Sequence, residues 1–348
     1  MLKIEMKAAV LYKVGDLRYE DFLLPKPRNG WALIRVKAVG LCGSDIPRLF
    51  ETGTYSFPLI PGHEFSGEVV AIKGKGKIKS GDRVTVFPLI PCKKCRWCKL
   101  GFFAQCNKYD YLGSRRHGAM AEYVQAPIEN IFPLPDKVTF SEASLTEPAS
   151  VALHALTRGE PLKGKTMALL GCGTIGLILA QLARIKGIKK SYLIDIDEDK
   201  LTKAREMGFK ETINSQKAKV VDVLLKETRG EGVELVIEGV GLSITYNQSI
   251  AITSKLGKIV FLGNPLEEVR LKKELVSKIL RGEITIEGTW NSVAMSTKGS
   301  EWKEVLGYMA QGKLRTSLLA KTFPLKEINQ VLEMVRQGKE SGKIIFVP

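Results

Sequence analysis

The chain has 348 residues, of which 44% are hydrophobic, and this size and composition indicate a folded protein with two domains. No apolar run reaches the about 20 residues of a membrane-spanning helix, and the apolar stretch at the N-terminus is too short for a signal peptide. We therefore expect a cytoplasmic protein without a membrane partner. The formal net charge is +16, but the lysines are spread along the chain without interleaved aromatic residues. Solvated surfaces, or attraction of an anionic ligand, are therefore favoured over nucleic-acid binding.

Residues 1–150 carry short apolar runs separated by Gly and Pro turns. Five of these runs predict β-strands, at 7–12, 31–39, 67–72, 82–87 and 121–126. We expect a β-rich, barrel-like domain that also carries the candidate metal ligands.

A first group of possible metal ligands consists of Cys42, His63 and Glu64. One thiolate, one imidazole and one carboxylate would leave a fourth position on zinc for water or substrate, as catalytic zinc requires. A lone Cys and a lone His are more often a buried thiol and a hydrogen-bonded loop residue. Glycines flank both segments, however, and sharp backbone turns beside polar side chains favour a functional site.

Four cysteines follow within a short loop, with the spacing C-x2-C-x2-C-x7-C: Cys92, Cys95, Cys98 and Cys106. Thiolates this close favour a closed tetrahedral zinc site, which keeps no position open for substrate and stabilises its loop. A disulfide pair or an iron–sulfur cluster is the alternative. We therefore expect two zinc ions per chain with different roles.

Residues 151–287 alternate strand and helix patterns in a βαβ rhythm. An apolar strand leads into Gly171, Gly173 and Gly176, and an apolar helix follows them, which is the context of a dinucleotide-binding fingerprint. The next predicted strand carries Asp195, nineteen residues after Gly176, where it would bind the ribose hydroxyls of NAD. The other candidate cofactor-binding residues are Thr174, Ile175, Val240 and Gly263.

The coenzyme domain should contain six strands, at 166–170, 191–196, 211–215, 234–240, 258–263 and 284–290. Residues 288–348 contain two helical patterns and a final strand pattern. This segment is too short to form its own core. We expect it to return to the first domain and complete it.

The motifs LCGSD, PGHEFSGEV, the four-cysteine loop, Glu147–Pro148 and GCGTIG with DID together resemble the zinc-dependent medium-chain dehydrogenase/reductase family, in its polyol branch. The resemblance implies an α/β fold: a GroES-like β-rich catalytic domain plus a Rossmann coenzyme domain with a doubly wound parallel sheet. It implies that Cys42, His63 and Glu64 bind catalytic zinc and that the four clustered cysteines bind structural zinc. It also implies that Glu147 can enter the coordination of the catalytic metal and that Ser44 relays a proton.

One departure from the family pattern concerns the relay. Sorbitol dehydrogenases usually carry a His five residues after the ligand Cys, whereas this chain has Pro47 there, followed by Arg48. Proline cannot transfer protons, and the polyol-phosphate members resemble this chain at these positions. The resemblance therefore implies a sugar alcohol or sugar-alcohol phosphate as substrate, oxidised to a ketose with NAD. The candidate substrate residues are Arg48, Arg115, Arg116 and Trp290.

Two alternatives remain from the sequence. The first is a zinc dehydrogenase of another secondary alcohol, such as sorbitol, threonine or butanediol. The second is a non-catalytic nucleotide-binding protein, which would not need an open metal site. The family resemblance further implies a homodimer or a homotetramer.

Overall fold

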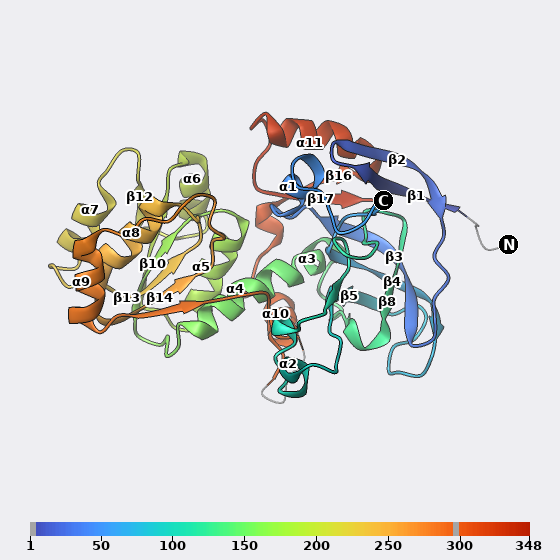
Figure 1. The fold of residues 1–348 in the computed structure, drawn as a ribbon, viewed down its shortest axis with the longest axis horizontal. Coiled ribbons are helices and arrows are strands. Elements are labelled where there is room, and N and C mark those ends of the chain that lie inside the picture. The colour runs from blue at the N-terminus through green and yellow to red at the C-terminus, as the bar shows by residue number, and fades with distance from the viewer. Residues whose placement is uncertain (1–4, 295–298) are drawn as a thin grey trace. The chain divides into compact units, whose positions relative to one another are not determined.

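The computed structural model describes residues 5–294 and 299–348. The chain forms two compact units, one up to Ser150 and again from Ser292 onward, the other Val151–Asn291 (Figure 1). The boundary predicted at 287 falls inside a strand, and the second unit extends to Asn291. Among the described residues, no helix combines the length and apolar character needed to cross a membrane.

The first unit is built on a seven-stranded sheet in the order β16-β17-β3-β4-β5-β9, with β8 also paired to β3. These strands are β3 (Trp31–Gly40), β4 (Glu64–Lys73), β5 (Arg83–Val86), β8 (Tyr123–Pro127), β9 (Ile131–Pro133), β16 (Ala320–Pro324) and β17 (Lys343–Val347). β17 pairs with β3 in antiparallel register, so the end of the chain becomes an interior strand of this sheet. The C-terminal segment therefore contributes two strands, β16 and β17, to the sheet of the first unit.

Smaller elements surround this sheet. A hairpin of β1 (Glu5–Lys13) and β2 (Asp16–Leu23) precedes it, and β2 is a strand that the sequence patterns did not indicate. A short pair, β6 (Leu89–Ile90) and β7 (Asp110–Tyr111), frames the cysteine loop. The helices are α1 (Asp45–Phe50), α2 (Arg96–Lys99), α3 (Phe140–Ser144), α4 (Thr146–Arg158), α10 (Glu301–Ala310) and α11 (Ile328–Arg336).

The second unit contains a six-stranded sheet in the order β12-β11-β10-β13-β14-β15, with every pair parallel. The strands are β10 (Thr166–Leu170), β11 (Lys190–Asp195), β12 (Thr212–Asn214), β13 (Val233–Glu238), β14 (Thr253–Phe261) and β15 (Thr285–Gly288). This order reverses direction between β10 and β13, which is the topological switch point of a doubly wound fold. The expected α/β fold class is confirmed.

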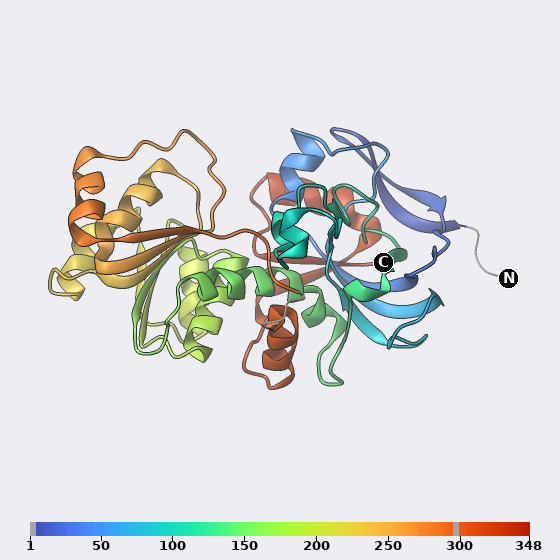
Figure 2. The same ribbon diagram turned by 60° about the horizontal axis from the view of Figure 1, so that its bottom comes forward.

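Helices cover both faces of this parallel sheet, as Figure 2 shows from a second direction. They are α5 (Thr174–Ile185), α6 (Glu198–Glu206), α7 (Val220–Glu227), α8 (Ser243–Ile252) and α9 (Lys273–Gly282). Because both faces are covered, the central strands are almost wholly apolar, and Leu169, Leu193 and Ile237 are fully buried in one register row. The register brings the carboxyl ends of β10, β11 and β13 to one edge of the sheet.

Candidate functional site

Three candidate metal ligands, Cys42, His63 and Glu64, come together in the first unit. Cys42 follows strand β3, and His63 and Glu64 lie at the start of β4; Gly40 of β3 pairs with Glu64. One ligand atom from each of the three lies within 4.8 Å of the others. His63 is 4% exposed and Glu64 is 1% exposed, so these polar groups are removed from water and need partners.

Asp45 orients the imidazole of this group. Its Oδ1 atom lies 3.5 Å from Nδ1 of His63, and its Oδ2 accepts a hydrogen bond of 3.1 Å from the Cys42 amide. Burial acts to raise the pKa of Asp45, but the contacts with His63, the charge of Arg48 and the hydrogen bond from the Cys42 amide together lower the pKa below its ordinary value. Burial acts to lower the pKa of His63, and the charges of Asp45 and Cys42 instead raise it well above the ordinary value. This contact leaves Nε2 of His63 for a metal.

Lys343 neutralises Glu64 from the far end of the chain. Its ammonium forms an ion pair with Oε2 of Glu64 and donates a hydrogen bond of 2.8 Å to the carbonyl of Leu41. Lys343 is 4% exposed. Burial acts to lower its pKa, but the charges of Glu64 and Cys42 raise it above the usual value. A side chain at Gly40 would collide with the Glu64 carboxylate, so the glycine makes room for this pair.

Glu147 lies beside the three ligands without joining them. Its Oε1 accepts a hydrogen bond of 3.1 Å from the Tyr111 hydroxyl, and the Tyr111 ring packs edge-on against His63 at 5.7 Å between centroids. Burial, together with the charge of Glu64, raises the pKa of Glu147 to about 7. Burial and the Glu147 charge also raise the pKa of Tyr111 well above its ordinary value. In this structure Glu147 is therefore a neighbour of the three candidate ligands and not one of them.

Ser44 and Arg48 complete one side of this group. The Ser44 hydroxyl donates to Sγ of Cys42 at 3.2 Å and accepts from Nη1 of Arg48 at 2.8 Å. The same Nη1 lies 3.3 Å from Oδ1 of Asp45. The Arg48 side chain is 30% exposed, and its guanidinium lies beside the candidate proton-relay hydroxyl.

The residues of this group fit a zinc ion. They offer one sulfur, one nitrogen and one carboxylate oxygen, a donor set that zinc accepts. The Asp45 contact fixes the imidazole as carboxylates do behind zinc-binding histidines. With three donors, a fourth position would remain for substrate.

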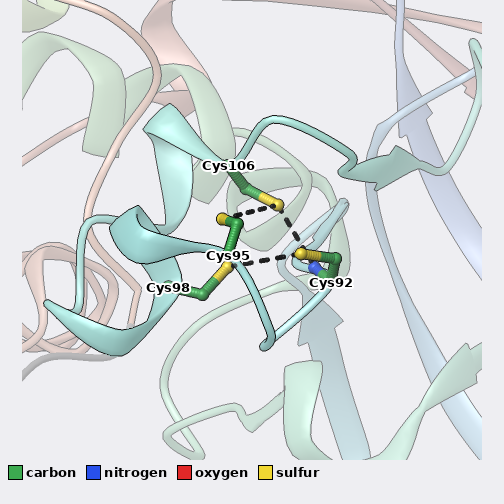
Figure 3. A group of neighbouring side chains, drawn as sticks. All are labelled: Cys92, Cys95, Cys98 and Cys106. Carbon is green, nitrogen blue, oxygen red and sulfur yellow. Dashed lines mark hydrogen bonds between the residues drawn. The ribbon is translucent and has the colours of Figure 1, made fainter.

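The four cysteines of the loop also converge, as Figure 3 shows. The Sγ atoms of Cys92 and Cys98 lie 4.0 Å apart, and those of Cys95 and Cys106 lie 3.9 Å apart. Zn–S bonds of about 2.3 Å in a tetrahedron separate sulfurs by about 3.8 Å, whereas a disulfide needs about 2.05 Å. All the cysteines, each within the described residues, are free thiols. The loop therefore fits a closed zinc site better than a disulfide pair.

Backbone amides prepare these thiols for metal binding. Hydrogen bonds from the amides of Cys98 and Asn107 lower the pKa of Cys95 to about 6. The amide of Cys92 donates to Sγ of Cys106 at 3.3 Å. Cys98 differs, because burial raises its pKa to about 12. A metal ion would have to displace the proton of this thiol.

The remaining candidate substrate residues are placed differently. Arg115 lies between two tyrosine rings, 4.0 Å from the centroid of Tyr55 and 4.2 Å from that of Tyr109. Arg116 is committed to Asp110 through its Nε, at 2.7 Å, and through a second ion-pair contact. Trp290 lies in the second unit and is 54% exposed, so its role at a substrate stays a prediction.

The glycine-rich turn after β10 has the geometry that phosphate binding needs. Gly171 has φ +99°, a left-handed conformation that favours glycine. Gly173 is the N-cap of α5, which begins with Thr174 and Ile175. A side chain on Gly176 would collide with the carbonyl of Gly171, so helix and turn pack backbone to backbone. The free amides at this helix N-terminus suit a pyrophosphate.

Asp195 closes the turn from the end of β11. Its Oδ2 accepts a hydrogen bond of 2.7 Å from the Cys172 amide, and its Oδ1 accepts one of 3.0 Å from the Asp197 amide. Lys200 lies 3.8 Å from Oδ1 of Asp195, a contact that the sequence motif did not indicate. The carboxylate is thus fixed beside the glycine-rich turn.

Val240 and Gly263 lie in the two neighbouring turns of the same sheet edge. A side chain at Gly171 would come within 3.1 Å of Cγ2 of Val240. A side chain at Gly263 would meet the Val240 amide at 2.7 Å and Oε2 of Glu238 at 2.9 Å. The buried Glu238 was not among the residues singled out from the sequence, although a carboxylate ending an apolar strand is a visible signal.

Two family models match the chain, each over a different segment. Residues 28–136 match the alcohol dehydrogenase GroES-like domain, and residues 174–311 match the zinc-binding dehydrogenase domain. With the observed fold, these matches define a zinc-type oxidoreductase that combines a GroES-like domain with a Rossmann-like parallel sheet.

Relatives match over nearly the whole chain. Galactitol 1-phosphate 5-dehydrogenase of Escherichia coli (strain K12) is 32% identical over 99% of this chain and 100% of its own length. Sorbitol dehydrogenase of Bacillus subtilis (strain 168) is 30% identical, with coverages of 99% and 97%. The chain belongs to the zinc-type medium-chain alcohol dehydrogenase family, which confirms the predicted family.

Solved structures agree with this family. The crystal structure of galactitol-1-phosphate dehydrogenase from Escherichia coli has a TM-score of 0.92 and 31% identity, covering 99% of this chain and 100% of that one. A zinc-binding dehydrogenase from Sinorhizobium meliloti 1021, bound to NADP, has a TM-score of 0.91 and 27% identity, with coverages of 99% and 100%.

Proposed function

We propose that this chain oxidises a secondary hydroxyl of a sugar-alcohol phosphate to a ketone, with NAD as the oxidant and zinc held by Cys42, His63 and Glu64. The observation that carries the proposal is the convergence of these three ligands beside the Ser44 hydroxyl and the partly exposed guanidinium of Arg48. One side of the group offers metal donors, and the other offers a proton acceptor and a cation.

A zinc ion bound there would supply Lewis-acid polarisation of the substrate oxygen. The second zinc would be held by the four loop cysteines and would serve the fold alone. Ser44 is suited to relay the hydroxyl proton of the substrate: Oγ would take up that proton while it releases its own to solvent beside the partly exposed Arg48 side chain. The guanidinium that donates to Oγ would stabilise the negative charge that develops there when the serine proton leaves first. Asp45 holds the imidazole of His63 in place.

The substrate phosphate is assigned to Arg48, with Arg115 as a second candidate. Guanidinium binds phosphate in a two-pronged geometry, and the Arg48 side chain is 30% exposed beside the ligand group. We leave Arg116 out of the phosphate site, because Asp110 already neutralises it. The relative named for galactitol 1-phosphate supports the same substrate class.

A second candidate is an unphosphorylated secondary alcohol. It is favoured by the hydrogen bonds that already engage Arg48 with Ser44 and Asp45, which leave fewer donors for an anion. Relatives named for sorbitol and L-threonine support this alternative.

The choice of NAD rests on Asp195, whose buried carboxylate would repel a 2′-phosphate. Lys200 near Asp195 favours the competing NADP assignment, as does the NADP-bound neighbour. We place the enzyme in the cytoplasm as a homo-oligomer. The edge strand β15 and exposed apolar side chains nearby in the sheet and its helices, including Leu256, Leu280 and Ile286, support a partner surface on the second unit.

The decisive experiment is a substrate panel followed by coenzyme absorbance. Polyol 1-phosphates are compared with the same free polyols, L-threonine and butanediol, each with NAD and with NADP. The proposal requires the highest kcat/KM for a phosphorylated polyol with NAD. A higher value for a free polyol or for threonine would contradict the substrate assignment, and preference for NADP would contradict the coenzyme assignment.

A further inference from the structure

A fully buried carboxylate, Glu238, lies at the carboxyl end of β13, beside the switch point of the coenzyme sheet. The rest of the strand's buried positions are apolar, and among the described residues no cation forms an ion pair with Glu238. Burying an uncompensated carboxylate is costly, so the side chain must make interactions that an apolar residue could not.

Three donors converge on one oxygen of this carboxylate. Oε1 accepts from the amides of Val240 and Gly241, each at 2.9 Å. The Thr245 hydroxyl lies 2.8 Å from Oε1 and 2.8 Å from the Leu242 carbonyl, so its one hydrogen serves both acceptors. Val240 and Gly241 form the turn after β13, and Thr245 lies in the first turn of α8. The side chain therefore ties the turn to the start of the following helix.

The backbone of Glu238 extends the same connection to the next strand. Its carbonyl accepts from the amides of Leu262 and Gly263, at 2.8 and 2.9 Å, in the turn after β14. The second carboxylate oxygen, Oε2, has no hydrogen-bond partner among the described residues and lies against Gly263. Any side chain at position 263 would collide with this arrangement, which explains the glycine there.

This arrangement reaches the glycine-rich turn through Val240. The amide of Gly239 donates to the Leu170 carbonyl at 2.9 Å, which joins the turn after β13 to the end of β10. Val240 then packs beside Gly171, where an added side chain would lie 3.1 Å from it. Ligands of doubly wound sheets bind at this edge, at the switch point between these two strands.

We propose that Glu238 is a positioning residue for dinucleotide binding, because its carboxylate fixes the turn after β13 against the glycine-rich turn. The inference rests on the proposed coenzyme-binding function of the second unit. It assigns Glu238 no direct contact with the coenzyme. Its effect on the coenzyme passes through the placement of Val240 and Gly241.

The test compares Glu238→Ala, Glu238→Gln and a control at the other end of the same strand. The control is Glu234→Ala, because Glu234 accepts from the amide and the hydroxyl of Thr166 at 2.8 and 3.2 Å, far from the switch point. The dissociation constant of NADH is measured by fluorescence on the full chain, well below the melting temperature of each variant. Melting temperatures are recorded in parallel.

We expect Glu238→Ala to weaken NADH binding by about 10-fold or more, the size of a lost hydrogen bond to a charged group. Glu238→Gln keeps an acceptor at Oε1 and should stay within about 3-fold of the parent. Glu234→Ala should leave the dissociation constant unchanged, whatever its melting temperature. If Glu238 served the stability of the fold alone, its substitution would lower the melting temperature and leave the NADH affinity of the folded variant unchanged.

Two results would overturn the inference: NADH affinity within about 3-fold of the parent in folded Glu238→Ala, or equal losses in the Ala and Gln variants. If Glu238→Ala does not fold, Thr245→Val removes one of the three donors and should weaken binding by about 3-fold or more, and an unchanged affinity would again contradict the inference. A parent protein that binds neither NADH nor NADPH would instead refute the proposed function itself.

Discussion

The two candidate metal sites of the first unit are built in opposite ways. The four-cysteine site takes its donors from one loop, 92–106, in which Cys92 and Cys95 are partly exposed and Cys98 and Cys106 are buried. The other site takes Cys42, His63 and Glu64 from two strands and has Lys343 of a third strand behind it. Its His63 and Glu64 are buried while Cys42 is partly exposed, and the charges of the buried groups must balance one another.

This difference in construction indicates that the two candidate metal sites have different roles. A loop that brings four equivalent thiols together gains its order from the metal and offers no position for a substrate. The second site is shaped by the sheet before any metal binds, because the β3–β4 and β17–β3 registers fix its donors. Beside the donors of this site lie the hydroxyl of Ser44 and the guanidinium of Arg48.

The largest expected effect is on turnover. His63→Ala removes the nitrogen donor and should lower kcat by about 10³-fold or more, the several kcal/mol that a metal Lewis acid supplies. The matched control is His117→Ala, since His117 lies outside the ligand group, where it accepts a hydrogen bond from the Ile60 amide at 3.1 Å and packs edge-on against the Phe22 ring. Steady-state kinetics on both variants decide the matter, and a His63 variant with most of its activity would refute the catalytic assignment.

The next effect concerns the balance of buried charge. In the metal-free protein, Lys343→Met leaves Glu64 buried without its cation and should lower the free energy of unfolding by about 3–5 kcal/mol. The control is Lys321→Met on the adjacent strand β16, whose ion pair with Glu340 has a 57% exposed lysine. That change should cost at most about 1 kcal/mol. Urea unfolding of both variants measures the difference, and equal costs would contradict the balance described here.

Substrate discrimination should depend on Arg48. Arg48→Ala should lower kcat/KM for a polyol phosphate by about 10–150-fold, the equivalent of about 1.5–3 kcal/mol for a charge-assisted contact. The matching free polyol should lose less, because it has no phosphate contact to lose and is affected only through the hydrogen bonds of Arg48 to Ser44 and Asp45. Arg18→Ala serves as control, since Arg18 pairs with Asp16 on the β2 surface. Equal losses on both substrates would favour a free polyol or another alcohol as the substrate.

The smallest effect is a pH dependence that lies outside both metal groups. Partial burial, with a contribution from Arg116, lowers the pKa of His117, so the folded chain favours the neutral imidazole. The unfolded chain protonates first as the pH falls below about 6.5, so this contribution to stability is present above that pH and is lost below it. His117→Gln should flatten the fall in unfolding free energy over this range. An unchanged pH profile would show that His117 contributes nothing to it.

The sequence predicted the local features of the molecule well. Local patterns of neighbouring residues were enough to find the cysteine spacing, the glycine fingerprint and the six strands of the second sheet. The predicted fold class is confirmed. The strand boundaries were less accurate: the segment predicted as a strand at 234–240 ends at Glu238, where the turn begins. Glu238 was available as a signal, because a carboxylate at the end of an apolar strand needs partners.

The partners that complete the buried site could not be predicted in the same way. Lys343 approaches Glu64 only because the last strand pairs beside β3, and a single lysine in an apolar strand does not indicate its partner. The contact between Asp45 and His63 also depends on the tertiary fold, because His63 lies at the start of another strand. Tyr111 and Glu147 meet through similar long-range packing. Such contacts follow from tertiary structure and not from periodicity.

The central claim is that the loop cysteines hold a structural zinc while the buried group holds the catalytic one. Zinc content and zinc X-ray absorption of His63→Ala, beside the parent and Cys95→Ser, test this most directly. We predict two zinc ions per chain in the parent, and in His63→Ala one remaining zinc with only sulfur neighbours at about 2.3 Å. Two zinc ions in His63→Ala, or a remaining zinc with nitrogen or oxygen neighbours, would contradict the account.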